Sequence, residues 1–387
     1  MSEPGEIGLY VHWPYCARLC PYCDFNVVRD RGRREEQAAL AAAIIVDLKA
    51  QAAGLGRRRL VSVFLGGGTP SLMDPDWAGE IVGAARALFE PATDPEVTLE
   101  ANPTDAEAGR FAAFADAGVN RLSLGVQSLN DAQLAFLGRN HDAAEARRAA
   151  AVAAKAFPRL SIDLIYALPG QGEDAWRAEL AEAIALGAEH ISAYQLTLEG
   201  GTAFERAVRR GLWSPTETEA AARLYEATGE TLAGAGFEAY EVSNHARGEA
   251  ARSRHNLIYW RGGDYLGMGP GAHGRVTTPE GSRSATRAAA RIADYVATVG
   301  EAGCGLEERV RLSPAETALE RLLMGLRTVE GVALAELAPL AVDPLRLDAL
   351  AEAGLLSTRR GRVVASPKGR LVLDRIALDL AAGAPAG

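Results

Sequence analysis

Short segments rich in apolar and β-branched residues alternate with long Ala-rich segments along the N-terminal part of the chain. This alternation predicts repeated βα units, in which neighbouring strands run parallel and helices cover them. Six or seven such units are enough for an α/β protein built as a partial or full (β/α) barrel. The candidate strands span residues 9–13, 60–64, 96–100, 121–124, 160–165, 190–194 and 237–240, and residues 76–90 are a representative helical segment.

Residues suited to chemistry follow, end or lie in five of these candidate strands. Cys16 follows the first strand, Gly66–Pro70 ends the second and Glu100–Pro103 ends the third. Gly125–Gln127 closes the fourth strand, and Asp163 lies in the fifth. Barrels of parallel strands collect their chemistry at the carboxyl ends of the strands. We therefore expect these residues to meet at one edge of one barrel.

Three of the four cysteines fall close together, because Cys16, Cys20 and Cys23 form the pattern C-x3-C-x2-C. A tight group in a chain otherwise poor in cysteine indicates metal binding rather than a disulfide framework. Three thiolates from one loop can ligate three irons of a [4Fe-4S] cluster and leave the fourth iron open for the amine and carboxylate of S-adenosylmethionine. The alternative is a zinc site with His12 as fourth ligand, although zinc fingers usually pair their ligands across a longer stretch.

The charge and the apolar runs limit the partners and the location that we expect. The formal net charge of −9 argues against nucleic acid or an anionic membrane as the main partner. The longest apolar run, residues 38–46, is too short to cross a bilayer. Residues 1–8 contain two glutamates and no cationic segment, which argues against a secretory signal. We therefore expect a cytoplasmic protein.

The βα pattern ends near residue 243, and this change predicts three regions. Residues 1–243 are expected to form the barrel that carries the metal site. Residues 244–310 are expected to form a linking region, whose first part is dense in His, Tyr, Trp and Gly. Residues 311–387 are expected to form a separate C-terminal module.

The C-terminal module begins with Ser313, a candidate helix N-cap, followed by Pro314 at the first helical position. Two more short helices follow, and then a hairpin with its turn at residues 359–362. A final helix is expected over residues 366–380. This order of elements resembles a small, mostly helical, winged-helix-like module.

The cysteine motif, with the aromatic Tyr22 just before its last cysteine, resembles the radical S-adenosylmethionine superfamily. The string Leu-Tyr-Val-His-Trp-Pro-Tyr-Cys is similar to that of oxygen-independent coproporphyrinogen III oxidases and their HemW-type haem chaperone relatives. The resemblance covers most of the chain and implies a radical SAM partial (β/α) barrel with the C-terminal module described above. Further matching strings are Gly-Gly-Gly-Thr-Pro-Ser, Glu-Ala-Asn-Pro, Arg-Leu-Ser-Leu-Gly-Val-Gln-Ser, Gly-Arg-Asn-His and Ile-Asp-Leu-Ile-Tyr-Ala-Leu-Pro-Gly-Gln.

The resemblance also implies a set of contacts to S-adenosylmethionine. Glycines let the backbone approach a ligand without an obstructing Cβ. Carboxylates can accept hydrogen bonds from ribose hydroxyls, and an arginine can fork onto a carboxylate. Read singly, a Gly-rich turn can be purely structural, and a glutamate at a strand end often partners a helix cap. The implied contacts are Tyr10, Gly67, Gly68, Thr69, Glu100, Gln127, Arg139 and Asp163.

Two departures separate this chain from the oxidases that it resembles. The oxidases carry a further cysteine two positions after the third, where this chain has Phe25. They also carry an extension before the first strand, whereas here only eight residues precede Leu9. Both departures speak against porphyrinogen decarboxylation, and the ending Cys-Asp-Phe resembles the HemW branch.

The string from His255 to Trp260 matches the H-N-x-x-Y-W motif of the HemW branch. A histidine imidazole can ligate haem iron, and aromatic rings can pack on the macrocycle. His255 is therefore the candidate haem contact. The alternative is a structural loop that caps the barrel, with His255 bonded to the backbone. His245 and His273 are rival ligands, and His273 is alternatively a residue that lines the cofactor pocket.

Three hypotheses follow for the function. The first is a haem chaperone without classical turnover that passes haem to acceptor proteins such as respiratory haem enzymes, and that can form a homodimer. The second is a radical enzyme acting on a porphyrin-like substrate. The third is a DNA-binding regulator, suggested by basic residues of the C-terminal module, although such a patch on an acidic protein is more often a solvated or docking face. These basic residues are Arg359, Arg360, Arg362, Lys368 and Arg370.

Overall fold

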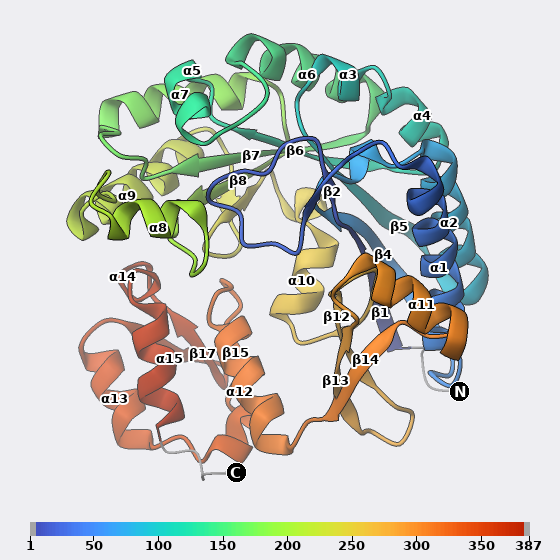
Figure 1. Ribbon diagram of the computed structural model, residues 1–387. Coiled ribbons are helices and arrows are strands. Elements are labelled where there is room, and N and C mark those ends of the chain that lie inside the picture. The colour runs from blue at the N-terminus through green and yellow to red at the C-terminus, as the bar shows by residue number, and fades with distance from the viewer. Residues whose placement is uncertain (1–4, 383–387) are drawn as a thin grey trace.

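The computed structural model describes residues 5–382 and shows an α/β protein built around one large, strongly curved sheet (Figure 1). The strands lie in the order β14-β13-β12-β11-β1-β4-β5-β6-β7-β8-β10-β9. Because β14 and β9 form its two edges, the described part of the sheet is an open, partial barrel. Its strands are β1 (Gly5–Trp13), β4 (Arg58–Gly67), β5 (Glu90–Ala101), β6 (Arg121–Gln127), β7 (Arg159–Tyr166), β8 (His190–Gln195), β9 (Glu238–Ala239), β10 (Asn244–Ala246), β11 (Asp264–Met268), β12 (His273–Thr277), β13 (Arg283–Ala288) and β14 (Leu306–Arg311).

Neighbouring strands from β11 through β1 and β4 to β8 run parallel, as the βα pattern predicts. All the strands expected between residues 9 and 194 lie in this parallel part. The expected strand over residues 237–240 is reduced to β9, which pairs antiparallel with β10 at the edge of the sheet. Phe237 still donates its N–H to the carbonyl of Leu232 in α9, so the strand cannot begin there. Tyr240 is buried just beyond β9, and its hydroxyl lies 2.8 Å from Nε2 of His190.

The connecting helices are Ala-rich, and most of them cover the convex face of the sheet (Figure 1). Small side chains allow close approach, and α6 buries five alanines against its neighbours. The helix expected over residues 76–90 is α2, which ends at Leu88 because Glu90 already belongs to β5. These helices are α1 (Arg34–Ala52), α2 (Pro75–Leu88), α3 (Asp105–Ala108), α4 (Phe111–Asp116), α5 (Asp131–Phe136), α6 (Ala143–Ala156), α7 (Glu173–Ala185), α8 (Ala203–Arg209), α9 (Thr218–Gly234) and α11 (Ile292–Ala302).

One helix, α10 (Arg254–Trp260), lies inside the curve of the sheet rather than outside it (Figure 1). Gly8 in β1 makes room for it, because a Cβ there would lie 2.5 Å from Cδ1 of Ile258. The segment that we expected to link two domains therefore fills the barrel with α10. It also extends the main sheet with β11 to β14.

The C-terminal region has its own hydrophobic core and a three-stranded sheet in the order β15-β17-β16. Ser313 caps α12 in a capping box with Glu316, as Ser-Pro predicts. The expected final helix is divided into α14 and α15, because Val372 between them has a non-helical backbone with φ of −132° and ψ of 30°. The elements are α12 (Pro314–Gly325), β15 (Val332–Ala333), the 3-10 helix η3 (Leu334–Leu340), α13 (Pro344–Glu352), β16 (Leu356–Arg359), β17 (Arg362–Ala365), α14 (Pro367–Arg370) and α15 (Leu373–Ala381).

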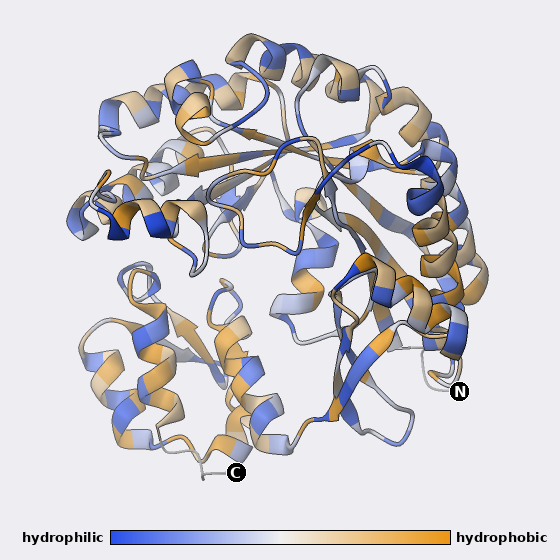
Figure 2. Ribbon diagram, in the orientation of Figure 1, coloured by the Kyte–Doolittle hydropathy of each residue, from blue (hydrophilic) through white to orange (hydrophobic). Residues whose placement is uncertain are grey.

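Hydrophobic residues concentrate on the strands, while hydrophilic residues alternate with apolar ones along the outer helices (Figure 2). The main core lies between the sheet and these helices and includes the fully buried Trp13, Phe111 and Trp176. Among residues 5–382, no helix is both long enough and apolar enough to cross a bilayer.

Candidate cofactor site and adjoining cavity

The three clustered cysteines lie on a loop that leaves the carboxyl end of β1. Cys16 is buried in the short strand β2 (Tyr15–Cys16), whereas Cys20 and Cys23 are partly exposed, and all three are free thiols. β2 pairs parallel with β3 (Val28–Arg29), and the N–H of Asp30 donates to the carbonyl of Cys16 at 2.8 Å. Backbone hydrogen bonds thus join the end of the loop to its beginning, and the loop holds its thiols near the ends of the strands.

His12 and Asn26 tie this loop to the barrel. The ring of His12 lies 3.0 Å from the Tyr10 hydroxyl through Nδ1 and 2.8 Å from the carbonyl of Asn26 through Nε2. The amide of Asn26 donates to the carbonyls of Pro270, at 2.9 Å, and Ala290, at 2.8 Å. Both ring nitrogens of His12 are therefore already engaged, which removes it as the fourth ligand of the zinc alternative.

Three cysteine thiols of one loop are the candidate metal ligands at this edge of the sheet. Among the described residues, no three or more of His, Cys, Asp and Glu are grouped as they would be around one metal ion. A cubane spreads its thiolate ligands over three irons, so three cysteines of one loop can serve it without a fourth protein ligand. Cys16, Cys20 and Cys23 are the residues that could hold such a cluster.

The Gly-rich turn after β4 packs against the cysteine loop. The N–H of Gly68 donates to the carbonyl of Trp13, and that of Thr69 donates to the carbonyl of Tyr15, both at 2.8 Å. A Cβ on Gly68 would lie 2.7 Å from the backbone of Tyr15. Gly67 has φ of 111°, and a Cβ there would meet the His12 ring at 2.7 Å. These glycines are needed for the protein's own packing, whatever ligand lies above them.

Two carboxylates from neighbouring parts of the sheet face the same interior. Glu100 accepts a hydrogen bond from the N–H of Gly67 at 3.1 Å. Asp163 accepts hydrogen bonds from the hydroxyls of Ser123, at 2.7 Å, and Ser161, at 3.1 Å. Burial, helped by the nearby charge of Asp163, raises the pKa of Glu100 to about 8. Burial also raises the pKa of Asp163, so the pair carries less than two negative charges at neutral pH.

Gln127 stands at the end of β6 in an unusual backbone conformation. Its φ of 65° lies in the left-handed region, and the ladder with β7 shifts register between Leu124 and Gln127. A non-glycine residue held in this region stores strain, which is often found at ligand sites. Its side-chain Nε2 lies close to Gly125, where an added Cβ would come within 2.9 Å of it.

Arg139 links the cysteine loop to the strand ends. Its Nη1 donates to Sγ of Cys20 at 3.5 Å and to the Tyr22 hydroxyl at 3.4 Å. Its Nη2 donates to the carbonyl of Gly125 at 2.9 Å and to Oδ1 of Asn102. Its Nε is buried and has no acceptor among the described residues. An unpaired buried donor beside the thiols fits a ligand that brings an acceptor such as a carboxylate.

His255 lies deeper in the barrel than these residues. Its ring is 1% exposed and stacks on Phe64 at 4.9 Å between centroids. Nδ1 lies 2.8 Å from the Ser62 hydroxyl, and Nε2 lies 2.6 Å from that of Tyr259. Burial lowers the pKa of His255 to about 3, so the ring is neutral. The expected haem contact is thus enclosed, and side chains rather than the backbone occupy both of its nitrogens.

The two rival histidines differ sharply in exposure. His245 in β10 is buried, and burial lowers its pKa to about 4. His273 opens β12 and is exposed. The pKa of His273 is lowered, mainly because its ring is partly buried and to a lesser extent because Arg275 and Arg287 are positively charged.

A cavity of about 560 Å³ lies beside the cofactor edge. It is lined by residues of β1, α10, β11 and β12 and by α12 of the C-terminal region. Tyr10 is the one implied S-adenosylmethionine contact that also lines it. The sequence gives no sign of this cavity. Tyr265, Thr317 and Met324 belong to no common motif, and they come together only in the folded chain. Its other lining residues include His12, Phe25, Asn26, Tyr259, Trp260, His273, Arg275, Arg283, Glu320 and Arg321.

Comparison with known families identifies two matching regions of the chain. Residues 10–183 match the radical SAM superfamily model, and residues 312–372 match the HemN C-terminal domain. The protein "Heme chaperone HemW" of Mycobacterium tuberculosis is 35% identical over 382 residues, covering 97% of this chain and 95% of the relative. That of Escherichia coli is 39% identical and covers 73% of each chain.

The chain is also similar to a mitochondrial protein and to one solved structure. "Radical S-adenosyl methionine domain-containing protein 1, mitochondrial" of Bos taurus is 45% identical, covering 85% of this chain and 75% of the relative. The solved structure of the coproporphyrinogen III oxidase HemN from Escherichia coli superposes with a TM-score of 0.81, covering 97% of this chain and 90% of the oxidase. At 21% identity, this structural likeness concerns the fold alone.

Proposed function

The chain belongs to the HemW family of the radical S-adenosylmethionine superfamily, and from this premise we propose that it binds haem and passes it to haem-dependent acceptor proteins. The observation that carries the proposal is the match to a protein named heme chaperone HemW along 95% of that protein's length. The match therefore includes the C-terminal region as well as the barrel. Respiratory haem enzymes are the class of acceptor that we propose.

The proposal assigns the cluster to Cys16, Cys20 and Cys23. Their loop is free of disulfides and lies at the carboxyl edge of the sheet. When bound there, a [4Fe-4S] cluster supplies a one-electron donor next to the sulfonium of S-adenosylmethionine.

The residues around the loop are suited to hold S-adenosylmethionine. The unpaired Nε of Arg139 can donate to the carboxylate of the methionine part. Glu100, with its raised pKa, can both donate to and accept from a ribose hydroxyl, and Asp163 lies close enough to influence it. We assign Tyr10, Gly67, Gly68, Thr69 and Gln127 to the same cofactor. Gly67 donates its N–H to Glu100, and Thr69 is linked to Arg139 through the amide of Asn102.

The oxidase fold match gives the second candidate function, radical oxidation of a porphyrinogen. The chain has Phe25 at the position of the oxidases' additional cysteine, and this side chain is 62% exposed. An exposed phenylalanine next to the cysteine loop cannot act as a thiol ligand or nucleophile there. The chaperone function is therefore favoured over turnover.

The test uses the full chain with its cluster reconstituted under anaerobic conditions. Haem is titrated while the Soret band is followed, and the loaded protein is then mixed with an apo-cytochrome from which it is separated by size. We expect stoichiometric binding, transfer of haem to the apo-cytochrome and no turnover of coproporphyrinogen III. Absence of haem binding would overturn the proposal, and coproporphyrinogen turnover would establish the second candidate.

A further inference from the structure

We propose that haem binds in the cavity between α10, β12 and α12, with His273 as the ligand of its iron. This inference rests on the proposed function and names the site for the haem. It departs from the H-N-x-x-Y-W motif, which places His255 as the haem contact. The histidine rings of the chain differ in exposure and in hydrogen bonding.

His273 differs from the other five histidines of the chain in being exposed with a ring free of hydrogen bonds to described residues. His12, His190 and His255 are buried and have both ring nitrogens within hydrogen-bonding distance of partners. His141 and His245 each keep an unpaired Nδ1, but their rings are 7% and 4% exposed. Binding of haem iron to either of these buried rings would require the protein to open. Iron can therefore reach the imidazole of His273 without the loss of an existing bond.

The walls of the cavity suit a flat aromatic macrocycle. Tyr10, Tyr259 and Tyr265 line it, and the rings of Tyr259 and Tyr265 meet edge to face at 4.5 Å between centroids. Trp260 and Met324 line it as well, and the indole N–H of Trp260 is buried without an acceptor among the described residues. Aromatic and thioether side chains pack well on π systems. A volume of about 560 Å³ lies within the usual range for cofactor sites.

The charged residues of the cavity suit the two propionates of haem. Arg275, Arg283 and Arg321 line it, against the single carboxylate of Glu320. Arg275 pairs with Glu320 at 2.7 Å. The other two arginines pair with carboxylates outside the lining, Arg283 with Asp264 at 2.9 Å and Arg321 with Glu336 at 2.7 Å. A guanidinium has five N–H donors, so an arginine with one carboxylate partner can still donate to a second. The cavity thus combines an apolar wall with three guanidinium groups that can donate to further carboxylates.

The cavity also lies next to the proposed cofactor site. Tyr10 separates the two, because it lines the cavity and approaches the carboxyl edge through its hydrogen bond to His12. Phe25 and Asn26, just after the last cluster cysteine, form another part of the wall. Haem bound here would contact the segment whose position depends on the cysteine loop.

The test compares haem binding by wild type, His273→Ala and His255→Asn, each with its cluster reconstituted anaerobically. We expect His273→Ala to lose the imidazole-ligated Soret and electron paramagnetic resonance spectra and to bind haem at least about tenfold more weakly. Added free imidazole should restore the spectrum in the space left by the side chain. We expect His255→Asn, provided that its circular dichroism is native, to keep the wild-type spectrum.

Metal-free protoporphyrin IX separates ligation from a general structural effect. His273→Ala should bind this porphyrin as wild type does, since no iron is present to ligate. Thr317→Trp, which fills the cavity from α12, should weaken the binding of both porphyrins. If wild type binds haem but His273→Ala keeps its spectrum and affinity, the inference is wrong and the proposed function stands. If wild type binds no haem, the proposed function itself fails.

Discussion

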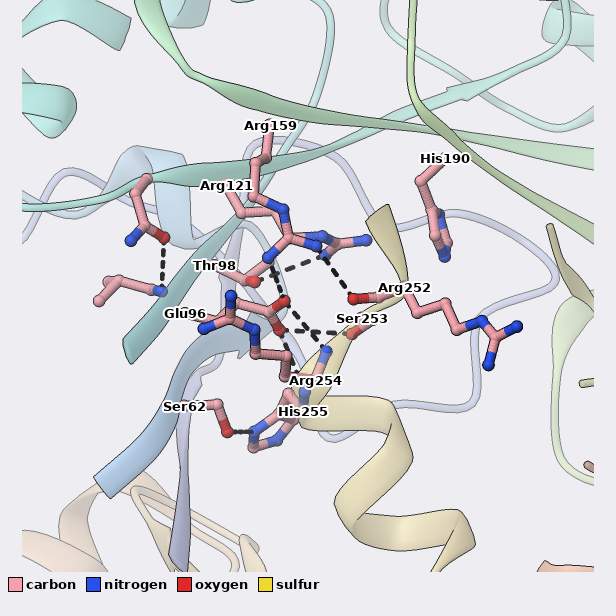
Figure 3. Close-up of polar contacts among 12 residues, drawn as sticks. Ser62, Glu96, Thr98, Arg121, Arg159, His190, Arg252, Ser253, Arg254 and His255 are labelled. Atoms are coloured by element: carbon pink, nitrogen blue, oxygen red, sulfur yellow. Dashed lines mark hydrogen bonds and ion pairs between the residues drawn. The ribbon is translucent and has the colours of Figure 1, made fainter. Parts of the chain in front are cut away.

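The carboxylate of Glu96 in β5 accepts the backbone N–H of His255 at 3.0 Å, so a strand of the sheet caps a helix that lies inside the barrel (Figure 3). It also accepts the N–H of Arg254 at 3.0 Å and pairs with Arg159 at 2.7 Å. Burial alone would raise the pKa of Glu96, but the charges of Arg121 and Arg159 and these two N–H groups hold that pKa below its ordinary value. One buried carboxylate therefore fixes the position of α10.

Glu96→Ala is expected to destabilise the protein strongly. It leaves Arg159 without its buried partner and removes the acceptor from the first turn of α10, a loss of about 3–5 kcal/mol in the free energy of unfolding. Denaturant unfolding monitored by circular dichroism measures it. Glu182→Ala is the control, because Glu182 pairs with Arg147 on the surface, where such a pair contributes about 1 kcal/mol or less. Equal effects of the two variants would contradict the capping role.

Glu100 makes stability depend on pH in a predictable direction. Its pKa is raised in the folded state, so the folded protein binds more protons than the unfolded one between the ordinary pKa and about 8. Stability should therefore fall as the pH rises through this window, with a slope of at most about 1.4 kcal/mol per pH unit. Unfolding of wild type and Glu100→Gln from pH 5 to 9 measures it. The variant should show the flatter profile, and identical profiles would refute the assignment.

Arg139→Gln should weaken the binding of S-adenosylmethionine by about tenfold or more, because a charge-assisted hydrogen bond is lost. Calorimetric titration of S-adenosylmethionine into reconstituted protein measures the affinity. Tyr22→Phe is the matched control, since it removes only the hydroxyl that Arg139 contacts at 3.4 Å. Iron content must be equal in all samples, because Arg139 also donates to Sγ of Cys20. Unchanged affinity at equal iron content would count against the assignment.

Gly68→Ala should impair cluster incorporation. The added methyl group would lie 2.7 Å from the backbone of Tyr15 and push the cysteine loop from its place. Iron and sulfide analysis after reconstitution gives the readout. Gly83→Ala is the control, because a Cβ on this residue of α2 meets nothing within 4 Å and alanine favours a helix by about 1 kcal/mol. A Gly68→Ala protein with a full cluster would show that the loop tolerates displacement.

The parallel half of the fold could be predicted because its strands have a strong local signal. The strand segments ending near Gly67, Glu100 and Gln127 are apolar and β-rich, and parallel pairing alone then brings their ends to one edge. The helix after Ser313 was equally predictable, since a capping box and a proline mark its start.

The remaining features depend on contacts between distant segments. The strand β14 reads Leu-Glu-Glu-Arg-Val-Arg, a charged pattern that does not predict a strand and that suits an edge. The motif of His255 indicated a functional residue, but its exposure depends on Ser62 and Phe64, which come from a strand far away in sequence. The cavity around His273 forms only when α12 reaches the barrel, so nothing in the sequence near His273 signals it.

The cavity wall crosses the junction between two separate hydrophobic cores, one in the barrel and one in the C-terminal region. Several ion pairs and a cation–π contact join the two parts: Arg275 with Glu320, Arg261 with Glu330, Arg327 with Glu241 and with the ring of Trp260. Polar junctions of this kind are typical of contacts between domains, and salt weakens the attraction of the more exposed pairs, such as Arg261 with Glu330. The haem pocket proposed here would thus take its walls from both parts of the chain, so its shape would depend on how the C-terminal region is seated on the barrel.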